Sequence, residues 1–155
     1  MENNFKKSLF WAFIFYYCNH HCSYKDYLMA KRQLYSIEFP VRCSPTILYS
    51  FLATPAGLQE WFAYLVDQRD GIFSFTWGGG NPERAKVVSS EENVCIRYSW
   101  LHEDPKEYFE FKIDTAEVSN QTILTVSAFA EKNDIKDESM MWEHQVKELF
   151  HRLGS

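Results

Sequence analysis

The chain has 155 residues, of which 46% are hydrophobic and 17% aromatic, so it can bury one sizeable core and we expect a single folded domain. The formal net charge is -5 with acids and bases interspersed, which argues against nucleic acid as a partner, because nucleic-acid binders carry a basic stripe. No apolar run reaches the roughly 18–20 residues that a membrane-spanning helix needs, so we expect no stable membrane insertion.

The first 28 residues differ in character from the rest. Lys6 and Lys7 precede an apolar run at 9–17 that has the length of a secretory core region, but no small-residue cleavage site follows it. Met29 begins a segment that is typical of a cytoplasmic start and leads directly into a strand. We therefore expect residues 1–28 to be an extraneous leader, from a misassigned start or disordered. An export signal and a membrane-surface anchor are the alternatives.

The four cysteines show no spacing that indicates a disulfide framework. Cys43 and Cys95 lie in or beside predicted strands, which favours buried reduced thiols and a reducing compartment such as the cytoplasm. Cys18 and Cys22 flank two adjacent histidines, an arrangement that does not easily close a tetrahedral metal site. We predict neither a metal nor a cofactor.

One strand and two short helices open the predicted domain, residues 29–155. Apolar and polar residues alternate over 35–42, which is typical of a half-buried strand, and Pro40 within it indicates an edge position or a bulge. Ser44-Pro45 and Thr54-Pro55 each pair a capping hydroxyl with proline, and each predicts a helix start. Gly57 in the second helix permits close backbone packing.

The middle of the chain is typical of an antiparallel meander with polar or glycine-rich turns. The clearest turns are Arg69-Asp70-Gly71 and the loop at 78–82. On the outer faces, Arg97 is expected to pair with a carboxylate of a neighbouring strand. The predicted strands are 64–67, 72–77, 83–89, 94–100, 109–114 and 122–130.

The last segment, Asp137–Leu153, is predicted to form a long amphipathic helix. Its apolar stripe consists of Trp142, Val146, Leu149, Phe150 and Leu153. The opposite face carries Glu138, Glu143, Lys147, Glu148 and Arg152. Asp137 is the expected cap, and Gly154 provides a left-handed exit. A stripe this aromatic needs a broad apolar surface, which the strands can supply.

This order of elements predicts an α+β helix-grip fold. Its parts are a curled antiparallel sheet of six or seven strands, two short helices after the first strand, and a long C-terminal helix packed on the sheet. The sheet must curl, because one helix cannot cover a flat sheet of that width. A curled sheet that grips a helix often leaves a cavity between them, and there we expect a ligand.

Several segments also carry a family resemblance. They are Ser44-Pro45, Leu48-Tyr49, and residues 54–62, 73–77, 97–100, 108–111 and 153–155. Through them, residues 29–155 resemble the START-like (SRPBCC) superfamily, and most closely small bacterial START-like proteins related to the heat-shock ATPase-activator homologues. The most specific element, Pro-x-Gly-Leu-x-x-Trp-Phe at 55–62, looks like a packing motif. Gly78 departs from the family, in which an acidic residue follows the tryptophan of a Trp-Asp-Gly turn.

The resemblance and the aromatic inner face together imply a non-enzymatic domain that binds a small hydrophobic ligand between the sheet and the C-terminal helix. The alternative is that the same side chains fill the core completely, and both interpretations stay open here. The predicted ligand-binding residues are Trp77, Tyr98, Trp100, Phe109, Phe111, Trp142 and Val146.

Two other functions stay open. The first is a protein-interaction module that resembles the heat-shock ATPase activators, binds a protein partner and needs no pocket. The second is a cyclase- or hydrolase-type enzyme that uses the same pocket, with His144 as its best candidate base. An exposed helix histidine explains His144 more simply. No Ser-His-Asp, Cys-His or two-carboxylate arrangement follows from spacing, so we predict no catalytic residue.

Overall fold

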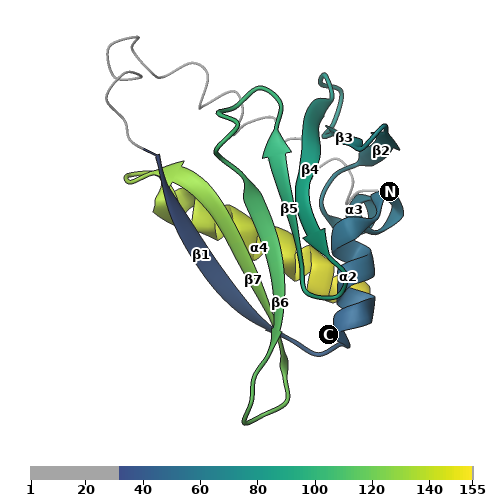
Figure 1. The fold of residues 1–155 in the computed structure, drawn as a ribbon, viewed down its shortest axis with the longest axis vertical. Coiled ribbons are helices and arrows are strands. Elements are labelled where there is room, and N and C mark those ends of the chain that lie inside the picture. The colour runs from purple at the N-terminus through teal and green to yellow at the C-terminus, as the bar shows by residue number, and fades with distance from the viewer. Residues whose placement is uncertain (1–31, 155) are drawn as a thin grey trace.

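The protein is described by a computed structural model that covers residues 32–154 (Figure 1). The predictions for residues 1–28, including the Cys18–Cys22 segment, lie outside this range. The helices are α2 (Pro45–Ala53), α3 (Pro55–Trp61) and α4 (Ile135–Leu153). The strands are β1 (Arg32–Val41), β2 (Leu65–Arg69), β3 (Ile72–Thr76), β4 (Glu83–Glu91), β5 (Cys95–Trp100), β6 (Phe109–Thr115) and β7 (Thr122–Glu131).

The seven strands form one antiparallel sheet in the order β1-β7-β6-β5-β4-β3-β2. The sheet curls, and α4 crosses one face of it (Figure 1). Helix α2 contacts β5 and β6, and α3 contacts β2. An ion pair of 3.7 Å between Arg152 and Glu60 places the C-terminal end of α4 beside α3. The predicted α+β helix-grip architecture is confirmed, with seven strands.

The edge strand β1 follows the predicted alternation. Tyr35, Ile37 and Phe39 are partly buried, Val41 is fully buried, and the residues between them are exposed. Pro40 pairs with Ile123 of β7 and lies on β1, the outermost strand of the sheet. An edge strand has no neighbour on its open side, so proline, which has no backbone N–H, is tolerated there. The edge prediction for Pro40 is therefore confirmed.

The short helices begin at the two predicted caps. The Ser44 hydroxyl accepts a hydrogen bond from the N–H of Ile47 at 3.4 Å, and that of Thr54 accepts one from Gly57 at 3.0 Å. Gly57 lies directly against the end of α2, because a Cβ there would stand only 2.6 Å from the Cα of Phe51. The close approach that the sequence predicted at Gly57 is confirmed.

The long helix begins earlier than predicted. It starts at Ile135 with Asp134 as its N-cap residue, so the predicted cap at Asp137 is wrong. Asp137 lies in the first turn instead, where its negative charge favours the positive end of the helix dipole. Gly154 ends the helix in the left-handed conformation with φ 70°, as predicted.

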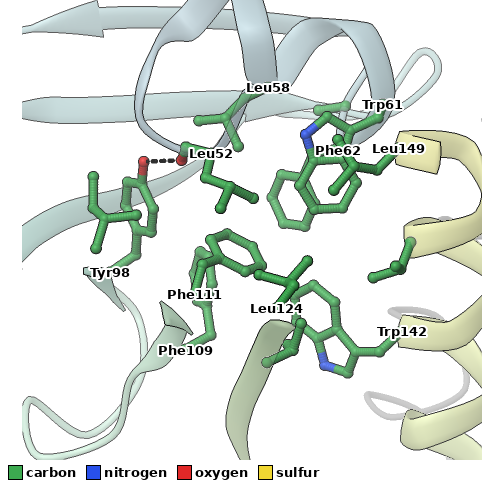
Figure 2. Close-up of a cluster of buried hydrophobic side chains, with 14 of the residues drawn as sticks. Leu52, Leu58, Trp61, Phe62, Tyr98, Phe109, Phe111, Leu124, Trp142 and Leu149 are labelled. Carbon is green, nitrogen blue, oxygen red and sulfur yellow. Dashed lines mark hydrogen bonds between the residues drawn. The ribbon is translucent and has the colours of Figure 1, made fainter. Parts of the chain in front are cut away.

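Phe62 occupies the centre of the core, between the sheet, α3 and α4 (Figure 2). Its ring is 5.2 Å from that of Phe75 and stacks on Trp142 at 5.9 Å, measured between centroids. Trp61 beside it donates its indole N–H to the carbonyl of Phe51 at 3.0 Å. Both side chains are 1% exposed, so the Trp-Phe element packs the short helices under the sheet.

Candidate functional site

The seven predicted ligand-binding residues all lie in the layer between the sheet and α4. Six of them are buried, with exposures from 0% for Tyr98, Phe111 and Val146 to 7% for Trp77 and Trp142. Trp100, at the end of β5, is the one that is only partly buried. The side chains thus form one continuous aromatic layer that reaches the surface at Trp100.

The rings of this layer contact one another from β3 to α4. The Trp100 centroid is 6.1 Å from that of Trp77 and 5.0 Å from that of Phe109. Phe109 in turn lies 6.2 Å from Trp142 of α4. These ring contacts join both sides of the layer, so a ligand that entered here would contact aromatic faces from the sheet and from the helix.

Two of the seven predicted residues already use their polar groups in hydrogen bonds inside the protein. The Tyr98 hydroxyl donates to the carbonyl of Leu52 at 2.8 Å (Figure 2), and the Trp77 indole N–H donates to that of Phe62 at 2.7 Å. Burial raises the pKa of Tyr98, because the phenolate would be poorly solvated there. These two donors fasten the short helices to the sheet, so the polar end of a site must come from other residues.

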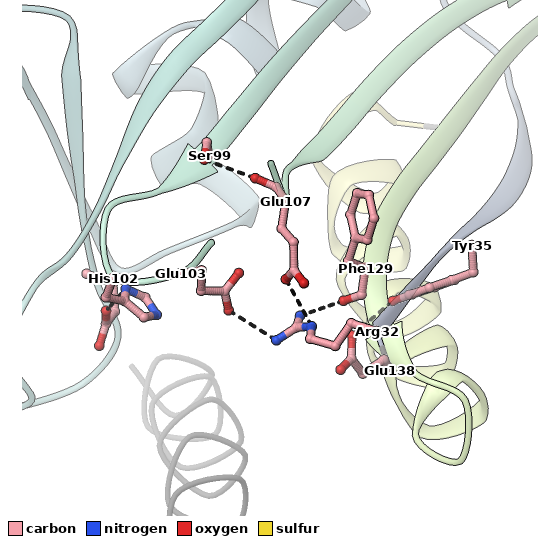
Figure 3. A network of polar contacts seen from close by, with 9 residues as sticks. Arg32, Tyr35, Ser99, His102, Glu103, Glu107, Phe129 and Glu138 are labelled. Carbon is pink, nitrogen blue, oxygen red and sulfur yellow. Dashed lines mark hydrogen bonds and ion pairs between the residues drawn. The ribbon is translucent and has the colours of Figure 1, made fainter. Parts of the chain in front are cut away.

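A polar cluster at the N-terminal end of α4 supplies such residues, and the sequence analysis missed it (Figure 3). The guanidinium of Arg32 contacts Glu107 at 3.0 Å and Glu103 at 3.6 Å, and also donates to the carbonyl of Phe129 at 2.6 Å. Glu103 and Glu107 belong to the β5–β6 connection, residues 101–108. Arg32 therefore ties the start of β1 to that connection.

Glu138 of α4 completes the cluster from the helix side. Its Oε2 accepts a hydrogen bond from the Tyr35 hydroxyl at 3.2 Å. Burial is the largest cause that raises the pKa of Glu138 from 4.5 to about 7, and Arg32 opposes that rise. Burial, followed by the charge of Glu138, raises the pKa of Tyr35. At neutral pH this carboxyl is divided between its protonated and ionised forms.

The polar cluster and the aromatic layer meet at Trp142. Glu138 and Trp142 are four residues apart on α4, so they lie on the same side of the helix. A side-chain hydrogen bond with Trp142 lowers the pKa of Tyr35, but the rise caused by burial is larger. Glu138 was predicted for the outer face, and that assignment is wrong. Its spacing of four from Trp142 is the signal that would have placed it correctly.

A family model described as the START-like superfamily domain matches residues 29–155. The chain belongs to this family. The matched range coincides with the predicted domain and contains every residue of the aromatic layer and of the polar cluster.

Solved structures share the fold of this START-like domain. A Bacteroides fragilis protein, BfR322, is 28% identical with a TM-score of 0.60, over 79% of this chain and 92% of that one. The Aha1 dimer from Colwellia psychrerythraea is 20% identical with a TM-score of 0.63, over 76% and 93%. DynU16, from the dynemicin biosynthetic locus, is 16% identical with a TM-score of 0.64, over 79% and 47%. No curated protein matches the chain.

His102 and His144 of the START-like domain lie in the β5–β6 connection and on α4. His102 contacts Glu83 at 3.2 Å and its ring is 6.0 Å from that of Trp100, at the rim of the aromatic layer. His144 is exposed on α4. Among residues 32–154, no group of three or more metal-ligating side chains is arranged to hold a metal ion.

Other features of the START-like domain serve its structure. Arg97 pairs with Glu110 at 2.7 Å on the outer face of the sheet, as predicted, and covers the ring of Tyr108 at 4.0 Å. Cys43 and Cys95 are unpaired thiols, each partly buried. Within the described range, no helix is long and apolar enough to cross a membrane.

Proposed function

We propose that this START-like domain is a non-enzymatic protein that binds a small hydrophobic molecule between the sheet and the N-terminal half of α4. The apolar part of the ligand contacts Trp100, which is the most exposed residue of the aromatic layer, and then Phe109 and Trp142, whose rings continue from Trp100 to α4. The other residues of the layer, Trp77, Tyr98, Phe111 and Val146, form the wall around it. Because the rings are in mutual contact, entry of the ligand moves the first turns of α4 away from the β5–β6 connection.

One observation carries this proposal: Glu138 lies partly buried on the sheet side of α4, one turn from Trp142. Burial of a carboxyl beside an apolar layer is costly, and the same burial raises the pKa of Glu138. Perturbed carboxyls beside apolar surface are enriched at binding and catalytic sites. An amphipathic ligand explains why a titrating carboxyl and a row of aromatic rings meet at one end of the layer.

The tryptophan indoles provide the test. The full chain is labelled with 15N and titrated with 4-phenylbutanol, an uncharged probe with an apolar body and one polar end. We expect the indole signals of Trp100 and Trp142 to shift, while that of Trp61, whose N–H is bound to Phe51, stays in place and serves as the internal control. If no indole signal shifts with this probe at saturation of its solubility, the proposed site is wrong.

A protein-interaction module is the second candidate, favoured by two exposed side chains at the start of the edge strand β2. Tyr64 is 58% and Leu65 51% exposed. Addition of a partner strand to β2 is disfavoured, because the N–H groups of Val66 and Gln68 already donate to Gln59 and Asp67. A partner would therefore contact side chains. Recovery of one defined protein by the wild-type chain, but not by a Tyr64→Ala, Leu65→Ala chain, would favour this function.

An enzyme that uses the same layer ranks third. Its best candidate base, His144, is exposed on the helix rather than directed at the aromatic layer. The Tyr35–Glu138 pair is the only alternative that the geometry of the described residues suggests, and it lacks a second polar group positioned against a reacting atom. Binding without chemistry accounts for the observed residues more simply.

A further inference from the structure

The polar cluster also indicates what kind of ligand head group the site accepts, an inference that rests on the proposed function. Each of its donor groups already contacts at least one acceptor. All three guanidinium nitrogens of Arg32 contact acceptors, and the Tyr35 hydroxyl donates to Glu138. A ligand that brought only acceptors would compete with the carboxylates and the carbonyl for the same donor groups.

Within residues 32–154, by contrast, acceptors of the cluster remain available. The contacts of the cluster use one oxygen of each carboxyl, namely Oε1 of Glu103 and Oε2 of Glu107 and Glu138. Among residues 32–154, the cluster contains three carboxyls and one guanidinium, so it carries excess negative charge when Glu138 is ionised. A group that supplies both hydrogen-bond donors and positive charge satisfies both needs.

The neighbouring rings favour the same chemistry. Trp142 lies one helical turn from Glu138, and Trp100 lies at the end of the strand that leads into the connection carrying Glu103 and Glu107. Tryptophan faces attract cations through their negative quadrupole. Carboxyl oxygens beside tryptophan faces are therefore suited to a protonated amine attached to an apolar body.

We infer that the ligand is an apolar amine, whose ammonium group is held by Glu138 with Glu103 and Glu107 around it and whose apolar body packs on Trp100 and Trp142. A carboxylate ligand is disfavoured, because it must compete with Glu103 and Glu107 for Arg32 and adds negative charge to the cluster. An alcohol binds more weakly than the amine, because it brings a single donor and no charge.

Binding of the amine is coupled to the ionisation of Glu138. The groups that act on Glu138 are Tyr35 and Arg32 from β1, Glu103 from the β5–β6 connection, and Asp134 from the start of α4 itself. An alkylamine stays protonated far above pH 8, so between pH 6 and pH 8 the group of the complex that titrates is the carboxyl of Glu138 and not the amine. An ammonium ion favours the ionised carboxylate, and its affinity therefore rises over this interval.

The test compares three molecules of one shape, 4-phenylbutylamine, 4-phenylbutanol and 4-phenylbutyrate, by titration calorimetry on the full chain at pH 6 and pH 8. We expect the amine to bind about tenfold more tightly than the alcohol at pH 8. The butyrate is expected to bind more weakly than both, and the preference for the amine should shrink at pH 6. Glu138→Gln should abolish the preference, while Glu143→Gln, which removes the same charge from an exposed position of α4, should keep it.

The outcomes separate the inference from the proposed function. Alcohol or butyrate binding as tight as that of the amine overturns the inference and leaves the apolar site intact. A preference for the amine that survives in Glu138→Gln overturns it as well, because the ammonium group then lies elsewhere. Failure of all three molecules to bind overturns both proposals. Circular dichroism of each variant confirms that the fold is retained.

Discussion

The hydroxyl of Tyr35 donates a hydrogen bond to the carboxyl of Glu138 at 3.2 Å, across 103 positions of the sequence. This bond joins the edge strand β1 to the first turns of α4. It also holds a titrating carboxyl against the aromatic layer, so the same contact affects stability and the proposed ligand site.

Glu138 should make stability depend on pH. Its pKa is raised from 4.5 to about 7 in the folded protein, so the folded state binds more protons than the unfolded chain within this interval. The contribution of Glu138 to the free energy of unfolding therefore falls as the pH rises from 4.5 to 7, and it stays low above pH 7. We therefore compare the free energy of unfolding of Glu138→Gln with that of wild type at each pH. The difference should shift in favour of the variant by about 1–3 kcal/mol from pH 5 to pH 8. Urea unfolding at the two pH values measures this difference.

A matched variant controls for the other carboxyls of the protein. Glu143 is exposed on α4, so Glu143→Gln should show a free energy of unfolding that follows wild type at both pH values. An equal difference between Glu138→Gln and wild type at pH 5 and pH 8 would show that Glu138 titrates as an ordinary surface carboxyl.

Gly57 should tolerate no side chain. A Cβ at this position would lie 2.2 Å from the carbonyl oxygen of Ser50 and 2.6 Å from the Cα of Phe51, both of them backbone atoms. Gly57→Ala must therefore push α3 away from α2, and we expect a loss of about 2–4 kcal/mol in the free energy of unfolding. Gly79→Ala, which meets nothing within 4 Å, should change stability by less than about 0.5 kcal/mol. Equal stabilities of the two variants would contradict the close packing of α2 and α3.

The hydroxyl of Thr54 should contribute to the stability of the protein. This oxygen accepts from the N–H of Gly57 at 3.0 Å and donates to the carbonyl of Ser50 at 2.7 Å, so it joins the end of α2 to the start of α3. Thr54→Ala is expected to destabilise the protein by about 1–2 kcal/mol, and Thr54→Ser should recover most of that loss. Thermal unfolding of the three proteins gives the comparison, and a serine variant as unstable as the alanine one would assign the effect to the methyl group instead.

The sequence by itself determined the features that depend on neighbouring residues. Alternation predicted the inner and outer faces of β1, and the turn at Asp70-Gly71 was correctly placed, where both residues have positive φ. The two cap-and-proline pairs predicted α2 and α3, and the aromatic stripe predicted that α4 packs on the sheet. Such signals are local, because burial, capping and turn geometry act within a few residues.

Tertiary structure alone decided how distant side chains meet. The polar cluster combines three parts of the chain, because it contains Arg32, Tyr35, Glu107 and Glu138. Only the curl of the sheet and the position of α4 on it bring these residues together. The same holds for Tyr98, whose hydroxyl donates to the carbonyl of Leu52, 46 positions earlier in the sequence. This donor is therefore not available to bind a ligand. Periodicity reports which residues are buried, but hydrogen-bond partners depend on the register and curvature that the whole fold imposes.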